Sequence, residues 1–277
     1  MGNSCPNSIP WKSSATTLMT QKWNPNTYLI FEKDRSRPAI DLLSQISLDT
    51  DGGIVDLGCG PGNITKIIRD LWPNRSLTGI DISEEMINEA KNKYQKTDIH
   101  WMKADIAHWV SDEKLALIFS NAALQWIPNH EILFLKIIHN LKSNGILGIQ
   151  IPLTKELNFQ KAIRKITCLP KWKNYFKNVK QINNSIKINK IYQILSNDCK
   201  DINIWKTNYY HILEGNSPVT EWIKGTGLTP YLSTLSNQNK NIFLDEYKEL
   251  INNMYPKQKD KKTILKMKRL FIVAKKK

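Results

Sequence analysis

The sequence lacks the features that mark metal-binding, disulfide-rich and membrane-spanning proteins. Its 277 residues include only four cysteines, none in a C-x-x-C pair, and five histidines, none in H-x-x-x-H or H-E-x-x-H spacing. This scarcity predicts neither a metal site nor a disulfide framework, and it favours a reducing, cytoplasmic compartment. Apolar runs stay well below the roughly 18 residues that a transmembrane helix needs, so no membrane span is expected.

The N-terminal segment also lacks a recognisable targeting signal. Residues 1–22 are polar and rich in Ser and Thr, without the apolar stretch of a secretory signal peptide. Met1-Gly2 is similar to the start of a myristoylation signal, but Pro6 occupies the position at which that signal carries Ser or Thr. We therefore predict a disordered extension over residues 1–22.

Arginine is scarce in the second half of the chain, although positive charge is concentrated there. Residues 1–150 carry 15 Lys/Arg and 16 Asp/Glu, whereas residues 151–277 carry 25 and 9, and only Arg164 and Arg269 are arginines in that half. A basic half suits an acidic ligand or nucleic acid. Compositional drift explains the same excess, because Lys and Asn rise together in AT-rich genomes. Both explanations stay open.

Apolar runs alternate with amphipathic stretches along the chain, which is typical of βαβ units around a parallel sheet. Residues 54–57 predict a buried strand, 63–71 a helix and 77–81 a second strand. Ser83 is expected to cap a helix that ends at Tyr94. Further strands are expected at 99–103, 115–120, 145–151, 202–212 and 270–274, further helices at 130–141, 155–168, 187–197, 219–225 and 239–255, and an irregular stretch at 169–187.

These elements predict an α/β fold with a doubly wound, seven-stranded, mostly parallel, Rossmann-like sheet and a helical cap. Residues 1–22 would be the extension and residues 23–152 the core that binds a cofactor. Residues 153–277 would supply the cap helices and the last two strands. The length suits one substantial core with a smaller insertion.

The turn Gly58-Cys59-Gly60-Pro61-Gly62 joins the first strand to a helix. Glycines allow a tight turn and a close backbone approach to a ligand at this crevice of an open α/β sheet. Alone this pattern is weak. Asp56, Asp81 and Asp105 lie at or beside the ends of the first three strands. Three acids repel a polyphosphate and favour a cationic ligand, so the sequence predicts a nucleoside site that is not a dinucleotide site.

Several stretches resemble the cofactor motifs of class I S-adenosylmethionine-dependent methyltransferases: Asp56 to Asn63, Gly79-Ile80-Asp81 and Ala104-Asp105-Ile106. The likeness extends to the trans-aconitate methyltransferase family, from about Trp23 to Lys275. The stretches that carry it are Trp23-Asn24-Pro25, Arg35-x-Arg37-Pro38-Ala39, Ile118 to His130, Trp205 to His211, Glu221 to Leu228 and Arg269 to Ala274. Leu153-Thr154 departs from the Asp-Asn pair that we expect the family to show after its fifth strand.

The resemblance implies a role for each matching residue. For S-adenosylmethionine it implies Asp56, Gly58, Cys59, Gly60 and Gly62 on the methionine part, Asp81 on the ribose, Ile82, Ile106 and Asp105 on adenine, Asn121 under the sulfonium, and Arg37 on the carboxylate of the cofactor or of the substrate. For the acceptor it implies Trp23, Tyr28, Trp126, Tyr210 and Arg269 as binding residues, with Gln125, Trp126 and Tyr209 as positioning candidates.

The expected reaction is the methylation of a carboxylate of a small polycarboxylic acid similar to trans-aconitate. Such a group is ionised at neutral pH and needs no general base, so no catalytic residue is predicted. We expect Arg37 and Arg269 to clamp other carboxylates of an acidic substrate. The alternatives are a malonyl thioester on an acidic carrier protein, RNA, which is less favoured, and a regulatory protein that binds the cofactor without turnover. A monomer is expected.

Overall fold

The computed structural model describes residue 25 and residues 30–179 and 187–277; the predicted extension over residues 1–22 lies outside them. The described residues belong to two compact units. A sheet unit comprises segments of Asn24–Lys155, Ile182–Ile212 and Leu265–Lys277. A helical unit comprises segments of Glu156–Gln181 and Leu213–Ile264. The division of the chain at residue 152 stays a prediction.

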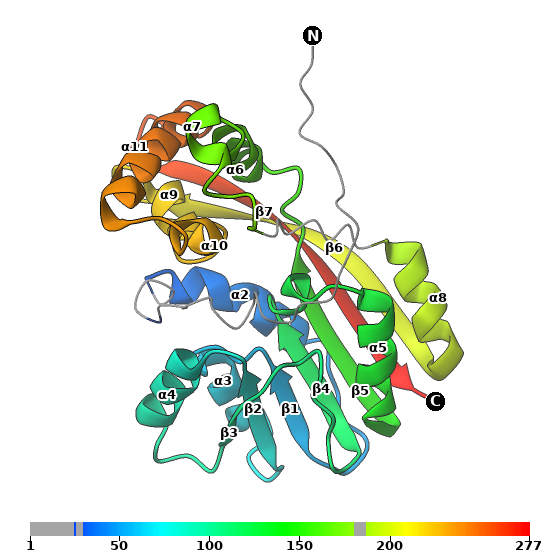
Figure 1. The fold of residues 1–277 in the computed structure, drawn as a ribbon. Coiled ribbons are helices and arrows are strands. Elements are labelled where there is room, and N and C mark those ends of the chain that lie inside the picture. Colours follow the sequence, from blue (N-terminus) through cyan, green and yellow to red (C-terminus); the bar gives the residue numbers. More distant parts are fainter. Residues whose placement is uncertain (1–24, 26–29, 180–186) are drawn as a thin grey trace. The chain divides into compact units, whose positions relative to one another are not determined.

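The sheet has seven strands in the order β3-β2-β1-β4-β5-β7-β6 (Figure 1). The strands are β1 (Ile54–Leu57), β2 (Leu77–Asp81), β3 (His100–Lys103), β4 (Leu115–Asn121), β5 (Leu141–Pro152), β6 (Cys199–Leu213) and β7 (Thr263–Lys276). The pairs from β3 across to β5 are parallel, and β7 runs antiparallel to β5. The predicted seven-stranded, mostly parallel sheet is confirmed. Its order reverses between β1 and β4, which places a crevice at the carboxyl ends of these strands.

Helices cover both faces of the sheet. The helices of the sheet unit are α2 (Glu32–Leu43), α3 (Asn63–Leu71), α4 (Glu84–Lys93), α5 (His130–His139) and α8 (Ile188–Asp198), with a 3₁₀ turn at Leu124–Trp126. On one face, apolar residues of α5 and α8 form a core with alternate residues of β5 and β7. The α2 helix packs on β5 and α3. Since Gly148 of β5 lies under Ile46, which follows α2 in the chain, this second face is the one that α2 covers.

The start of α4 agrees with the sequence, whereas the helix α2 does not follow from it. Ser83 caps α4, and its hydroxyl accepts a hydrogen bond from the Met86 backbone N–H at 3.3 Å, as predicted. The α2 helix was not predicted, because Pro38 and the charged run around Arg35 interrupt its apolar pattern. In the structure Ala39 and Leu42 of α2 are fully buried.

The helical unit has an aromatic core. Its helices are α6 (Asn158–Thr167), α7 (Pro170–Lys173), α9 (Pro218–Lys224), α10 (Thr229–Leu232) and α11 (Asn237–Met254). The rings of Trp172 and Phe176 pack edge-on against Phe243 of α11. The stretch predicted to be irregular therefore contains α7. Part of that stretch lies outside the described residues.

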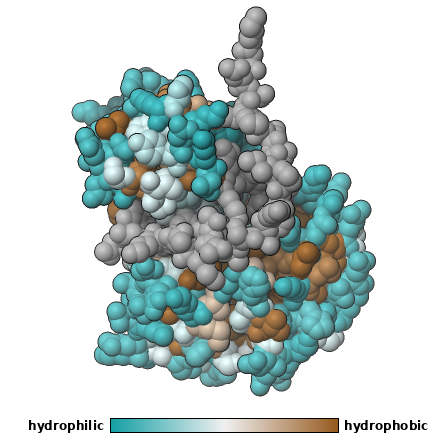
Figure 2. All heavy atoms as spheres, viewed as in Figure 1, coloured by the Kyte–Doolittle hydropathy of each residue, from teal (hydrophilic) through white to brown (hydrophobic). Residues whose placement is uncertain are grey.

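The cysteines differ in their bonding state, and the surface over α5 and α8 carries hydrophobic residues. Cys59 and Cys199 are free and buried, whereas Cys168 is disulfide-bonded, a single bridge that the scattered cysteines did not lead us to expect. No described helix is long and apolar enough to cross a membrane. In Figure 2 hydrophobic residues reach the surface over α5 and α8, where Ile132 and Leu135 are exposed.

Candidate active site

The three glycines after β1 serve two different purposes. A Cβ on Gly58 would lie 2.1 Å from the Cβ of Ala123, and a Cβ on Gly62 would lie 2.5 Å from the ring of Trp101. Both glycines are therefore required by packing. Gly60 also has a left-handed backbone, with φ of 55°, but no described residue lies within 4 Å of the position of its Cβ. Gly60 thus opens the turn toward free space that a ligand can fill.

Asp81 at the end of β2 fixes this turn. Its carboxylate accepts hydrogen bonds from the backbone N–H groups of Gly60 and Ser83, both at 2.9 Å. Burial raises its pKa, while these bonds oppose the shift. The Cys59 side chain is buried against Gly79 of β2, and burial holds the pKa of its thiol well above the usual range. Cys59 therefore presents its backbone, and not its sulfur, to a ligand in the turn.

Asp56 is the most deeply buried acid of the predicted site, with 2% of its surface exposed. Its carboxylate accepts a hydrogen bond of 2.7 Å from the Thr65 hydroxyl on α3. Burial, together with the negative charge of Asp81, raises the pKa of Asp56 from 3.8 to about 7, and the Thr65 bond opposes this. Asp56 thus links β1 to α3 through a hydrogen bond. With a pKa of about 7, its carboxyl group gains or loses its proton near neutral pH.

The predicted adenine side lies beyond β2 and β3. Ile106 approaches the turn, because its Cδ1 lies 3.7 Å from the position of a Cβ on Gly58. Ile82 follows β2 directly and is partly buried. Asp105 accepts a hydrogen bond from the Ala107 backbone N–H at 2.9 Å, and its other oxygen lies 3.0 Å from His108 Nδ1. Asp105 would therefore share this second oxygen between His108 and an adenine amino group.

The loop after β4 brings three predicted residues to the same edge of the sheet. Asn121 ends β4, and Ala122 follows in the left-handed region with φ of 55°, a conformation that costs a non-glycine residue about 1–2 kcal/mol. Gln125 donates from Nε2 to the Ala122 carbonyl at 2.6 Å, so its amide shapes the loop. Trp126 is half-buried at the end of the 3₁₀ turn.

A second group of predicted residues meets on the face of the sheet that α2 covers. Tyr209 of β6 donates to Asp41 at 2.6 Å, and its ring lies 5.6 Å from the Arg37 guanidinium. Arg269 of β7 is 5% exposed, and its charge acts on Tyr209 together with that of Arg37. Burial, the Asp41 bond and the Asp41 charge nevertheless keep the pKa of the Tyr209 phenol well above its usual range. We call Arg37, Tyr209, His211 and Arg269 the acceptor cluster.

The α2 helix, which the sequence did not predict, connects this cluster to the turn. Asp34 pairs with Nδ1 of the buried His211 at 3.1 Å, and burial lowers the pKa of that imidazole although Asp34 opposes the shift. Ser36 accepts a hydrogen bond from Asn63 Nδ2, at the start of α3, at 3.1 Å. The only sequence signal was Asp34, Arg37 and Asp41 at spacings of three and four, which places them on one face of a helix.

Other predicted residues are not brought together with these. Tyr210 lies on the opposite face of β6 from Tyr209 and is 56% exposed. The Lys266 ammonium of β7 lies 5.7 Å from the centre of its ring. Trp23 and Tyr28 lie outside the described residues. Within the described ranges, no group of His, Cys, Asp and Glu could hold a metal ion.

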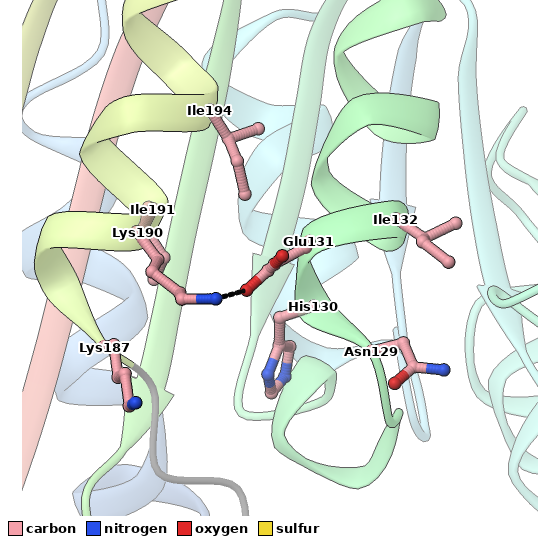
Figure 3. Close-up of a pocket in the computed structure, with 8 residues that line it drawn as sticks. All are labelled: Asn129, His130, Glu131, Ile132, Lys187, Lys190, Ile191 and Ile194. Atoms are coloured by element: carbon pink, nitrogen blue, oxygen red, sulfur yellow. Dashed lines mark hydrogen bonds and ion pairs between the residues drawn. The ribbon is translucent and has the colours of Figure 1, made fainter.

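A cavity of about 430 Å³ lies elsewhere in the sheet unit, between α5 and α8 (Figure 3). Lys190 and Glu131 form an ion pair of 2.6 Å across it. The predicted cofactor and acceptor residues are not among those that line it. Its lining residues are Asn129, His130, Glu131, Ile132, Lys187, Lys190, Ile191 and Ile194.

Alanine at Gly60 is expected to separate ligand binding from folding. The strain of a left-handed alanine should cost about 1–2 kcal/mol of stability, while the new methyl group occupies the open space and weakens S-adenosylmethionine binding at least tenfold. Gly215→Ala is the control, since Gly215 is also left-handed and its Cβ position is open. Gly58→Ala should instead prevent folding, because of the 2.1 Å contact. Thermal melting and calorimetric titration test this, and normal binding by Gly60→Ala would contradict it.

Asp56 predicts a pH dependence of stability. Its pKa is about 7 in the folded chain and near 3.8 otherwise. Between these values the folded chain holds a proton that the unfolded chain has released, so Asp56 makes stability fall by roughly 2–4 kcal/mol as pH rises from 4 to 7.5. Asp56→Asn should remove this fall, so that its melting temperature gains on the wild type as pH rises. Asp51→Asn, at an exposed acid, is the control, and equal pH profiles for Asp56→Asn and the wild type would refute the prediction.

Comparison with known proteins agrees with this geometry. Residues 54–145 match a family model described as a methyltransferase domain. Among solved structures, phosphoethanolamine N-methyltransferase 2 of Haemonchus contortus superposes with a TM-score of 0.58 at 15% identity, over 97% of this chain and 61% of that one. The YcgJ protein of Bacillus subtilis gives 0.55 at 12%, over 86% and 97%. At these identities the structures show a shared fold.

Curated relatives are closer in sequence. A trans-aconitate 2-methyltransferase of Escherichia coli O157:H7 (strain EC4115 / EHEC) is 35% identical over 252 residues, which cover 91% of this chain and 97% of the relative. The Klebsiella pneumoniae (strain 342) protein of the same name is 37% identical over 257 residues, covering 92% and 98%. With the turn, the strand-end acids and this coverage together, the chain belongs to the trans-aconitate 2-methyltransferase family.

Proposed function

We propose that this methyltransferase transfers a methyl group from S-adenosylmethionine to a carboxylate of trans-aconitate or a similar small polycarboxylic acid. The observation that carries the proposal is Arg269, a nearly buried guanidinium in the acceptor cluster, beside the carboxyl end of β5. A guanidinium binds a carboxylate through two parallel hydrogen bonds. Arg37 supplies a second cation to the same cluster, as an acid with several carboxylates requires.

The residues of the turn fit the cofactor. No described residue approaches the Cβ position of Gly60, and Asp81 lies behind the turn as a hydrogen-bond acceptor. When bound, S-adenosylmethionine supplies an activated methyl group on a cationic sulfonium. The acids Asp56 and Asp81 suit that charge. Gly58, Cys59, Gly60 and Gly62 would hold the methionine part through their backbone, with Ile82, Asp105 and Ile106 toward adenine and Asn121 beneath the sulfonium.

The chain has little proton chemistry to perform on such an acceptor. A carboxylate is already ionised at neutral pH, so the protein contributes by orienting the acid and excluding water. The Tyr209 hydroxyl is committed to Asp41, and His211 to Asp34. In our proposal these two side chains hold α2 in place, while Arg37 and Arg269 contact the acid.

The test is transfer of label from methyl-labelled S-adenosylmethionine to a panel of acceptors. The panel contains trans-aconitate, other small di- and tricarboxylic acids, a malonyl thioester on an acidic carrier protein and bulk RNA. Label in a base-labile ester of a small acid is the expected result. Label only in the carrier or in RNA would reject the small acid as the acceptor. Analytical sedimentation of the same preparation tests its oligomeric state, which we expect to be monomeric.

A further inference from the structure

Gln150 of β5 is a buried amide that has no hydrogen-bond partner in the described part of the chain. Its side chain is completely buried, and neither Oε1 nor Nε2 has a hydrogen-bond partner among the described residues. The assignment of oxygen and nitrogen does not matter here, because both atoms are unpaired. Buried polar groups are almost always paired, since an unpaired one loses its bonds to water without replacement. An apolar side chain at this position would therefore make a more stable protein.

The position of Gln150 in the sheet explains which group it can meet. Its neighbours Ile149 and Ile151 belong to the core with α5 and α8, so Gln150 points to the face that α2 covers. Gln150 pairs with Asn121 on β4 and with Phe271 on β7. The Oδ1 atom of Asn121 is likewise buried and has no partner within the described ranges. The unpaired Gln150 amide and the unpaired Asn121 amide oxygen thus belong to paired residues near the carboxyl ends of adjacent strands.

The same face connects Gln150 to the acceptor cluster. Arg269 pairs with Pro152, two residues along from the Gln150–Phe271 pair, so Gln150 and Arg269 are diagonal neighbours about 7–8 Å apart at their Cα atoms. Tyr209 packs on Phe271 with ring centroids 6.3 Å apart. A carboxylate that lies over this face of the two strands is therefore placed to accept hydrogen bonds from the guanidinium and the amide together.

We propose that Gln150 is a specificity-determining residue whose amide donates to a carboxylate of the acceptor acid held by Arg269. The inference rests on the proposed function and adds Gln150 to the residues that recognise the acceptor acid. A carboxylate offers only acceptors, and the amide nitrogen offers two donors without partners. Because solvent does not reach the amide in this structure, binding includes a local movement of the side chains around it. After such a movement, the carboxylate of the acid becomes the hydrogen-bond partner that the amide lacks in this structure.

The experiment compares Gln150→Leu with the wild type in three measurements: acceptor KM, cofactor affinity and melting temperature. Loss of the amide should raise the KM for the acid at least tenfold and leave cofactor affinity within twofold. The melting temperature should stay equal or rise, since an unpaired polar group has been removed. Gln150→Glu should raise KM further, because a carboxylate repels the acid. Gln150→Met, which has a flexible chain of similar length, replaces Gln150→Leu if that variant does not fold.

Thr220→Val is the matched control. The Thr220 hydroxyl on α9 is also fully buried and unpaired among the described residues, so valine should raise the melting temperature without changing the KM. An active wild type whose acceptor KM is unchanged by Gln150→Leu would overturn the inference and leave the proposed function standing. A wild type that methylates no small acid would overturn both.

Discussion

Replacing Asp81 with asparagine is expected to weaken S-adenosylmethionine binding about 100-fold, the largest single effect in the cofactor half. The carboxylate accepts from two backbone N–H groups, those of Gly60 and Ser83, and an asparagine NH₂ would face one of these donors with a donor of its own. Hydrogen bonds to a charged group contribute about 1.5–3 kcal/mol each. Loss of the turn geometry and of the predicted ribose contact accounts for the factor. Calorimetric titration of the purified variant measures it.

Stability should change much less than cofactor affinity in this variant. Burial raises the pKa of Asp81, so removing its charge relieves a desolvation cost while the two backbone bonds are weakened. Glu84→Gln is the control, because Glu84 is an exposed acid three residues away that pairs with Lys103. Equal cofactor affinity in Asp81→Asn and Glu84→Gln would show that Asp81 is not the anchor of the turn.

Arg269→Lys is expected to lower kcat/KM for the acid about 100-fold while cofactor affinity is retained. Lysine keeps the charge but loses the planar fork that binds a carboxylate through two parallel bonds, so the substitution is not conservative at such a site. Arg269 is 5% exposed, and few water molecules can replace the missing contact. Steady-state kinetics with trans-aconitate as the varied substrate measures the loss, which should fall mainly on KM.

Lys268→Met provides the control for charge alone. Lys268 is the preceding residue of β7, is exposed and points to the opposite face of the strand. Its removal should leave kcat/KM for a small acid within a factor of two. A similar loss in both variants would mean that general positive charge, and not a fork at Arg269, attracts the acid. That result would favour a large acidic acceptor.

The candidate cofactor residues could be named from the sequence because each lies in a short local motif. Gly58 to Gly62 follow β1 directly, Asp81 ends β2 and Asp105 comes two residues after β3, and the carboxyl ends of parallel strands meet at one edge of a sheet. The strand order then brings these residues close together, since β1 lies between β2 and β4. What the sequence could not show is why each glycine is needed. Contacts with Ala123 and Trp101, both distant in sequence, distinguish Gly58 and Gly62 from Gly60.

The acceptor half depended on contacts across the whole chain. Tyr209 and Asp41 are 168 residues apart, and His211 and Asp34 are 177 apart. No local pattern predicts such pairs. The sequence named Tyr209 and Tyr210 together, but strand alternation puts them on opposite faces, and only the position of α2 shows which face holds the acceptor cluster.

The sequence by itself determined the α/β class, the turn that fits the cofactor and the acids at the ends of the strands. These features depend on apolar periodicity, on glycine and on strand ends, all of which are local. The tertiary structure alone decided that α2 joins the turn to β6, that Arg269 is buried, and that Gln150 lies beside Asn121 without a hydrogen-bond partner among the residues that the structure describes. Burial and long-range pairing depend on how distant segments pack, and a side chain acquires those properties only when the sheet has formed.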